Sequence, residues 1–299
     1  MVSARPASNS ARAPRLAREV ERMLTTVARL VDKAIDAPRP TDATLHELHR
    51  GLRRLRLGLE LWADVLPTAD RAGVHSLVRR TKRLARLVGE VRDRDVVLGL
   101  FDAIPRRAAG AAATGRYHRF LARLRDDSRT GRELLRASLR TERDAGLFVE
   151  GRAALARRPS PRAAGHLSHV IAAAGSGRID RVRRAHKKAT RRPTPERLHR
   201  LRIELRQFRH LNELIRLVTP EEPARVPIAL RRLQDRLGRL HDLDVAVATI
   251  DPELDRSPWA DRLRDERRRL RRGIRLDLER LSLPSVRPTP AGRPPRSGP

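Results

Sequence analysis

Two segments of the chain, 153 residues apart, are similar along their whole length. Residues 40–67 (PTDATLHELHRGLRRLRLGLELWADVLP) and residues 193–220 (PTPERLHRLRIELRQFRHLNELIRLVTP) are identical at 12 of 28 positions. A second pair follows in the same order, because residues 87–97 (LVGEVRDRDVV) match residues 236–246 (RLGRLHDLDVA) at an offset of 149. Ordered matches with nearly equal offsets indicate a duplication, and a period of about 150 residues is too long for a solenoid. The chain is therefore predicted to contain two copies of one unit.

Apolar residues recur with the helical period through most of the chain. One stripe runs from Leu16 to Val31 and another from Leu45 to Trp62. Sustained alternation of apolar and polar residues is absent, so no sheet is expected, and prolines interrupt the stripes at intervals. The fold class is predicted to be all-α, with about four helices in each unit.

The two ends of the chain differ in composition from its body. Residues 1–14 carry no apolar stripe, and residues 284–299 contain six prolines and two glycines. Both segments are predicted to be disordered. The body, residues 15–283, then divides into a first lobe of about 15–150 and a second of about 160–283.

A net charge of +31 points to a polyanionic partner: nucleic acid, an acidic membrane surface or a phosphate polymer. All but four of the 67 basic residues are arginine, whose planar guanidinium binds two phosphate oxygens at once. Aromatic residues make up only 2%, which argues against base stacking. The sequence contains no membrane-spanning apolar run, no secretion-signal pattern and no cysteine, so a cytoplasmic protein without disulfides or thiolate metal sites is expected.

The first repeated segment places a basic stripe beside the apolar face of its helix. With 3.6 residues per turn, His46, Arg53 and Arg56 share this stripe, next to the leucines of the apolar face. The second copy repeats it with four residues: His199, Arg202, Arg206 and Arg209. An ordinary amphipathic helix whose arginines pair with carboxylates would explain one copy. Because the stripe recurs at matched positions, we expect it to lie on the rim or floor of a groove, where partial desolvation strengthens contacts between arginine and phosphate.

The second repeated segment carries two aspartate pairs: Asp93 with Asp95, and Asp242 with Asp244. Residues two apart on a helix face different sides and cannot share one metal ion. One aspartate of each pair is instead predicted to face the groove and orient a histidine or arginine. His241-Asp242 is similar to the dyad of helical phosphohydrolases, but the other copy has Arg92 in place of the histidine. Neither a metal site nor another cofactor is predicted.

The pattern His46-x-x-His49-x-x-x-Arg53-Arg54-x-Arg56, with its second copy from His199 to Arg209, resembles the signature of the CHAD family, the "conserved histidine α-helical domain". Residues 237–245, and more loosely 88–96, resemble the second signature of that family. One departure is His49, which stands where the family has arginine. The resemblance suggests a weaker or pH-dependent phosphate contact at that position.

The resemblance, which covers roughly residues 15–283, implies two four-helix bundles related by a pseudo-twofold axis. Between them it implies one basic groove that binds inorganic polyphosphate, at polyphosphate granules and without catalysis. The implied groove residues are His46, Arg53, Arg54, Arg56, His199, Arg202, Arg206 and Arg209. Arg54 lies off the basic stripe and is included on the resemblance alone. Four basic residues on the helices that lead into the aspartate motifs are further expected ligands: Lys82, Arg83, Arg231 and Arg232.

Two other functions remain open on the sequence. An architectural protein that binds nucleic-acid backbones would also suit the charge and the basic tail. If polyphosphate is the main ligand, nucleic acid is expected to be a weaker polyanionic partner. An enzyme acting on phosphate would need a nucleophile, a base or a metal site, and no convincing one is present. The chain is therefore predicted not to be an enzyme.

Overall fold

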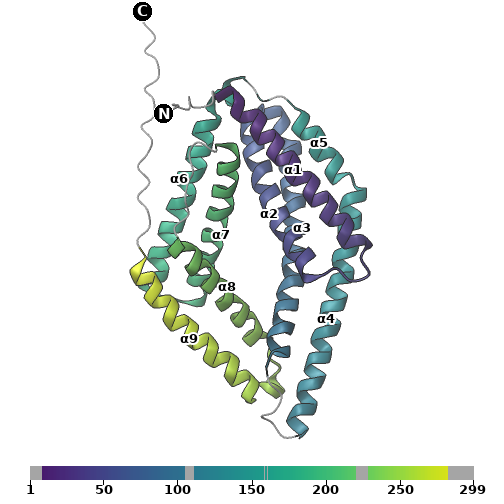
Figure 1. Cartoon of the computed structure of the whole chain (residues 1–299), viewed down its shortest axis with the longest axis vertical. Coiled ribbons are helices and arrows are strands. Elements are labelled where there is room, and N and C mark those ends of the chain that lie inside the picture. Colours follow the sequence, from purple (N-terminus) through teal and green to yellow (C-terminus); the bar gives the residue numbers. More distant parts are fainter. Residues whose placement is uncertain (1–8, 105–110, 158, 160, 220–227, 282–299) are drawn as a thin grey trace, which may run out of the picture.

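The computed structural model describes residues 9–104, 111–157, 159, 161–219 and 228–281. In these ranges every regular element is helical, which confirms the predicted all-α class. The elements, drawn in Figure 1, are α1 (Asn9–Asp36), α2 (Asp42–Val65), α3 (Thr68–Asp102), α4 (Ala111–Asp144), α5 (Leu147–Ala156), α6 (Pro161–Arg191), α7 (Pro195–Val218), α8 (Ile228–Thr249), the 3₁₀ helix η1 (Pro252–Leu254) and α9 (Pro258–Arg280).

Helices α2 and α7, which carry the first repeated segment, begin in the same way. Thr41 Oγ1 accepts a hydrogen bond from the backbone N–H of Thr44, and Thr194 Oγ1 accepts one from that of Arg197. Each cap satisfies a backbone donor that the first helical turn leaves without a partner. Because both helices start at matched positions and are 24 residues long, their basic stripes have the same phase.

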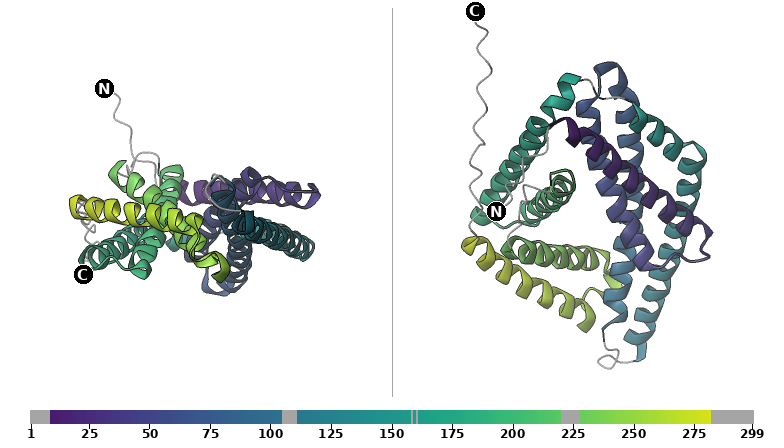
Figure 2. Two further views of the ribbon diagram at one scale, coloured as in Figure 1. Left: turned by 90° about the horizontal axis from the view of Figure 1, so that it is seen from below. Right: turned by 45° about the horizontal axis from the view of Figure 1, so that its top comes forward.

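The second repeated segment lies on α3 and α8. Helix α2 contacts α7, and α3 contacts α8, so that all four repeated segments meet in the middle of the molecule. The remaining long helices, α1, α4, α6 and α9, lie outside these four (Figures 1 and 2). This arrangement brings together basic residues that are about 150 residues apart in the sequence.

Buried apolar residues form three clusters among the described residues. The largest packs α1–α5 together with residues of α6 and α7 such as Ile171 and Leu214, so the core is not divided at the expected boundary between lobes. A second cluster joins α6, α7, α8 and α9. A third joins the C-terminal end of α3 and the N-terminal part of α4 to α8 and α9. The third contains the stacked rings of Tyr117 and Trp259, 4.3 Å apart. The pseudo-twofold relation between two separate bundles stays a prediction.

The N-terminal segment is more ordered than expected. Helix α1 begins at Asn9, so residues 9–14, predicted to be disordered, are helical. Ala13 is only 2% exposed, and burying its side chain and that of Leu16 favours extending the helix over these residues. Residues 1–8 and the predicted tail, 284–299, lie outside the described residues. No helix in the described part of the chain is both long and apolar enough to span a membrane.

Candidate functional site

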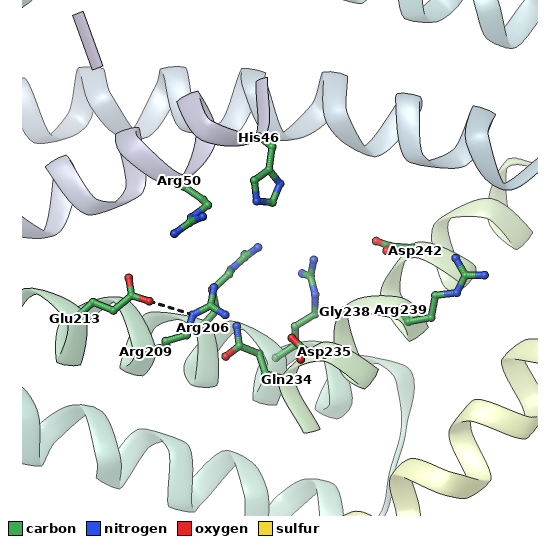
Figure 3. Close-up of a pocket in the computed structure, with 11 residues that line it drawn as sticks. His46, Arg50, Arg206, Arg209, Glu213, Gln234, Asp235, Gly238, Arg239 and Asp242 are labelled. Atoms are coloured by element: carbon green, nitrogen blue, oxygen red, sulfur yellow. Dashed lines mark ion pairs between the residues drawn. The ribbon is translucent and has the colours of Figure 1, made fainter. Parts of the chain in front are cut away.

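The four central helices enclose two adjoining pockets lined mainly by charged residues. The first, of about 540 Å³, lies between α2, α7 and α8 (Figure 3) and is lined by His46, Arg50, Arg202, Arg206, Arg209, Glu213, Gln234, Asp235, Gly238, Arg239 and Asp242. The second, of about 640 Å³, lies between α2, α3 and α7 and is lined by Arg53, Arg56, Arg79, Lys82, Arg83, Ala85, Arg86, Gly89, Glu90, Asp93, Ile203, Arg206 and Gln207. Both pockets include Arg206, and together they are called the basic groove below.

Arg206 lies at the junction of the two pockets and is half-buried. Burial, with Arg53 and Arg202 close by, lowers the pKa of its guanidinium to about 9, so it remains a cation at neutral pH. Its Nε atom is buried without a hydrogen-bond partner among the described residues. A buried donor without a partner is costly, so this guanidinium is suited to bind an anion that enters the groove.

Arg53 and Arg202 share this environment. Burial, followed by the nearby Arg56 and Arg202, lowers the pKa of Arg53 to about 10. Burial also lowers the pKa of Arg202, against the opposing effects of Asp242 and Asp93. Among the described residues neither arginine forms an ion pair within 4.0 Å, which leaves both charges available to a ligand.

The last arginine of each stripe is partly neutralised by a glutamate one turn further along its helix. Arg56 Nε lies 3.4 Å from Glu60 Oε1, and Arg209 Nε lies 3.7 Å from Glu213 Oε1. Figure 3 shows the second of these pairs at the side of the first pocket. The two pairs are at matching positions of the repeat. Arg56 and Arg209 therefore have less uncompensated positive charge to offer a ligand than Arg53 and Arg206 have.

His46 lines the first pocket, whereas His199 and His241 line neither pocket, and all three rings are neutral at pH 7. Burial is the main cause that lowers the pKa of His46, His199 and His241, and nearby arginines add to it. His241 reaches about 4, and its ring centroid lies 5.1 Å from that of His199. The arginines therefore supply the positive charge of the groove.

His49, the departure from the family pattern, is buried at 6% exposure. Its Nε2 accepts a hydrogen bond from Arg53 Nε at 2.8 Å, and its Nδ1 lies 3.1 Å from Arg92 Nη1. Burial and these two arginines lower the pKa of His49 to about 2, so the ring is neutral and does not act as a phosphate-binding cation.

The two aspartates of each pair have different surroundings. Asp93 and Asp242 line the groove, and burial raises the pKa of both although Arg202 opposes it. Asp95 instead accepts a hydrogen bond from Arg132 of α4 at 2.7 Å. Asp244 likewise accepts one from Arg267 of α9 at 2.7 Å. The first aspartate of each pair thus faces the arginines, and the second ties its helix to the next.

The other expected ligands are distributed unevenly. Lys82 and Arg83 line the second pocket, although Arg83 also pairs with Glu142 at 3.0 Å. Arg54 donates to Glu213 and so is held by a carboxylate. The structure does not bring Arg231 and Arg232 to the groove, since both are exposed on α8 and line neither pocket.

Several groove residues were missed by the sequence reasoning: Arg50, Arg79, Arg86 and Arg239. Arg79 and Arg86 lie one turn to either side of Lys82 and Arg83, a helical spacing that could have identified them. Arg50 and Arg239 carried no repeated signal, because the matching positions hold Ile203 and Glu90. In the described part of the chain, no group of three or more His, Asp or Glu side chains is placed to hold a metal ion.

Comparisons with known proteins identify the family and the fold of the chain. The family model of the CHAD domain matches residues 39–251, which include all four repeated segments. The crystal structure of the CHAD domain from the plant Ricinus communis is similar, with a TM-score of 0.61 and 19% identity, over 95% of this chain and 96% of that one. No curated protein matches the chain in sequence. Since the family match extends over more than half of its residues, the chain belongs to the CHAD domain family.

Proposed function

We propose that the basic groove binds inorganic polyphosphate and performs no catalysis. The observation that carries this proposal is the group formed by Arg53, Arg202 and Arg206, which are half-buried and lack a carboxylate within ion-pair distance among the described residues. Charges held this way interact strongly with an anion, because partial exclusion of water reduces screening. Resemblance to polyphosphate-binding CHAD proteins supports the same ligand.

The chemistry of the groove lining favours a bare phosphate chain over nucleic acid. The residues that line the two pockets include no Phe, Tyr or Trp on which a base could stack. The buried Tyr117 and Trp259 pack in the core instead. Polyphosphate has a charge on every unit and no bases, so arginine forks satisfy it along its whole length.

The same lining supports binding without catalysis. It contains no serine, threonine or cysteine to act as a nucleophile. Its acidic members, such as Asp93 and Asp242, lie among arginines. In the cell, we expect the protein to be located at polyphosphate granules in the cytoplasm.

Direct competition tests the ligand. Long-chain polyphosphate and duplex DNA are titrated against the full chain by calorimetry, and each is then used to displace the other. Polyphosphate is expected to displace DNA at a far lower phosphate concentration. If DNA displaces polyphosphate as readily, the groove is a general site for nucleic-acid backbones.

A stoichiometry measurement tests whether both repeats line one site. The double variants R53E/R56E and R206E/R209E should each abolish tight binding of a long chain, because each removes one side of the shared groove. If each instead halves the stoichiometry at unchanged affinity, two independent sites exist.

A further inference from the structure

The two repeats exchange an arginine and a histidine at two matched positions. Position 49 corresponds to 202, and position 92 corresponds to 241, by the offsets of 153 and 149. The first repeat has His49 and Arg92, whereas the second has Arg202 and His241. Each repeat therefore keeps one arginine and one histidine at this pair of positions, in opposite order.

In the first repeat the two side chains are in direct contact. Arg92 Nη1 lies 3.1 Å from Nδ1 of the buried His49, whose Nε2 accepts from Arg53. The His49 ring lies over Gly89, where a Cβ atom would be 3.4 Å from Nε2. His49 thus fills the space between α2 and α3, where it accepts a hydrogen bond from Arg53 of α2 and packs against Arg92 of α3.

In the second repeat the arginine occupies the other position. Arg202 lines the first pocket. A Cβ atom at Gly238, which matches Gly89, would meet no atom within 4 Å, so no ring covers this glycine. Burial is the main cause that lowers the pKa of His241, and the nearby charge of Arg202 is the second. The histidine here comes from α8 and the groove-lining arginine from α7.

Arg92 lines neither of the two pockets of the basic groove, but it lies at a neighbouring pocket. It lines a further pocket with His46, and His46 lines the first pocket as well. Its charge acts on both Arg202 and Arg206. Arg92 is half-buried and, among the described residues, has no carboxylate within 4.0 Å.

We propose that Arg92 supplies to the first repeat the phosphate-binding guanidinium that Arg202 supplies to the second, and that His49 is a positioning residue that accepts a hydrogen bond from Arg53 and packs against Arg92. This inference rests on the proposed function of the groove. Although His49 replaces the arginine of the family pattern on α2, the first repeat still has a cation at this pair of positions, which is Arg92 on α3. His49 and Arg92 form one unit, in which an arginine at position 49 alone would face two guanidinium groups.

An exchange experiment on the full chain tests this unit. The variants are H49R, R92H and the combined H49R/R92H, which gives the first repeat the order of the second. Polyphosphate affinity is measured by calorimetry, and thermal stability is measured without ligand. R92H is expected to weaken binding about tenfold, the loss of one charge-assisted contact. H49R is expected to lower the melting temperature, because three cations then meet in a buried space.

The combined variant separates a coupled unit from two independent residues. Its affinity is expected to return to within about threefold of wild type, and its melting temperature to rise above that of H49R. The proposal is overturned if the two single effects simply add, or if R92H leaves affinity unchanged. The mirror exchange R202H/H241R should behave in the same way, and it provides the test if H49R does not fold.

Wild-type protein distinguishes this inference from the proposed function. If wild type does not bind polyphosphate, the proposed function fails. If wild type binds and the combined variant does not recover, only the inference about Arg92 fails. Recovery of the melting temperature without ligand reports on the His49–Arg92 unit in either case.

Discussion

Arg54 of α2 donates a hydrogen bond from Nε to Glu213 Oε2 of α7, at a distance of 3.0 Å. The two residues are 159 positions apart, and their contact joins the two repeated helices beside the first pocket. Glu213 also lies 3.6 Å from the buried His210 through Oε2. Burial would raise the pKa of Glu213, but His210 and Arg54 together lower it to about 2.

This low pKa predicts a pH-dependent contribution to stability. A carboxyl group whose folded-state pKa is depressed stabilises the protein above its unfolded pKa and loses that effect as the pH falls through the folded value. E213Q should therefore cost about 1 kcal/mol at pH 7, since the side chain is a third exposed and solvent screens the pair. Urea denaturation should show the cost shrinking as the pH falls from 4.5 towards about 2.

The matched control is E60Q. Glu60 is at the same position of the first repeat and is 41% exposed, and its one ion pair within 4.0 Å among the described residues is with Arg56 of its own helix. It should cost a few tenths of a kcal/mol, the usual range for a helix pair at this spacing. An equal loss for both variants, or a loss for E213Q that does not change with pH, would contradict the role of the Arg54–Glu213 contact.

The arginines that lack a carboxylate should matter most for binding. R206Q and R53Q should each weaken polyphosphate binding by about tenfold or more, the effect of a charge-assisted hydrogen bond of about 1.5–3 kcal/mol. R209Q should weaken it less, because Glu213 already neutralises part of the charge of Arg209. Calorimetric titration gives the comparison. R152Q is the control, since Arg152 is exposed on α5 at the outer edge of the molecule (Figure 1). An equal loss in R152Q would mean that only net charge matters.

Binding should also take up protons. Burial and nearby arginines lower the pKa of His46, His199 and His241 in the free protein, and a bound polyanion must raise them. Affinity should therefore increase as the pH falls from 8 towards about 5, and should level off near the free value of His241, about 4. Titrations in buffers of different ionisation enthalpy measure the uptake directly.

The variant that tests this linkage is H241N. It should flatten part of the pH dependence, whereas H118N, at an exposed site on α4, should leave it unchanged. A pH-independent affinity between pH 8 and pH 5 would show that the pKa values of His46, His199 and His241 do not respond to the bound ligand.

Salt should weaken binding strongly. If the groove engages about six phosphates, the single-strand slope of roughly −0.7 per contact predicts that log K falls by about 4 per decade of salt. Removal of one contact in R206Q should reduce the slope by about 0.7. Fluorescence anisotropy of labelled polyphosphate over a range of sodium chloride concentrations provides the measurement. A flat response would exclude phosphate contacts as the main source of affinity.

Much of the fold was predictable because helix formation follows local rules. The apolar stripe from Leu45 to Trp62 follows from the period of 3.6, and the structure places it on one helix, α2. The N-terminal boundary was not predictable in this way. Residues 9–14 are helical because α1 packs Ala13 into the core, and packing partners are not visible in a local pattern.

Which residues share a helix face, and which residues correspond between the repeats, can be read from the order of residues in the chain, because periodicity and duplication are properties of that order. Which charges are paired cannot be read in this way and depends on the packing of the helices. Arg54 pairs with Glu213, whereas Arg206 has no carboxylate within 4.0 Å in the part of the chain that the structure describes, and His49 lies between two arginines. Burial and ion pairing differ between these residues because α2, α3, α7 and α8 pack together, and this packing joins residues that are about 150 positions apart.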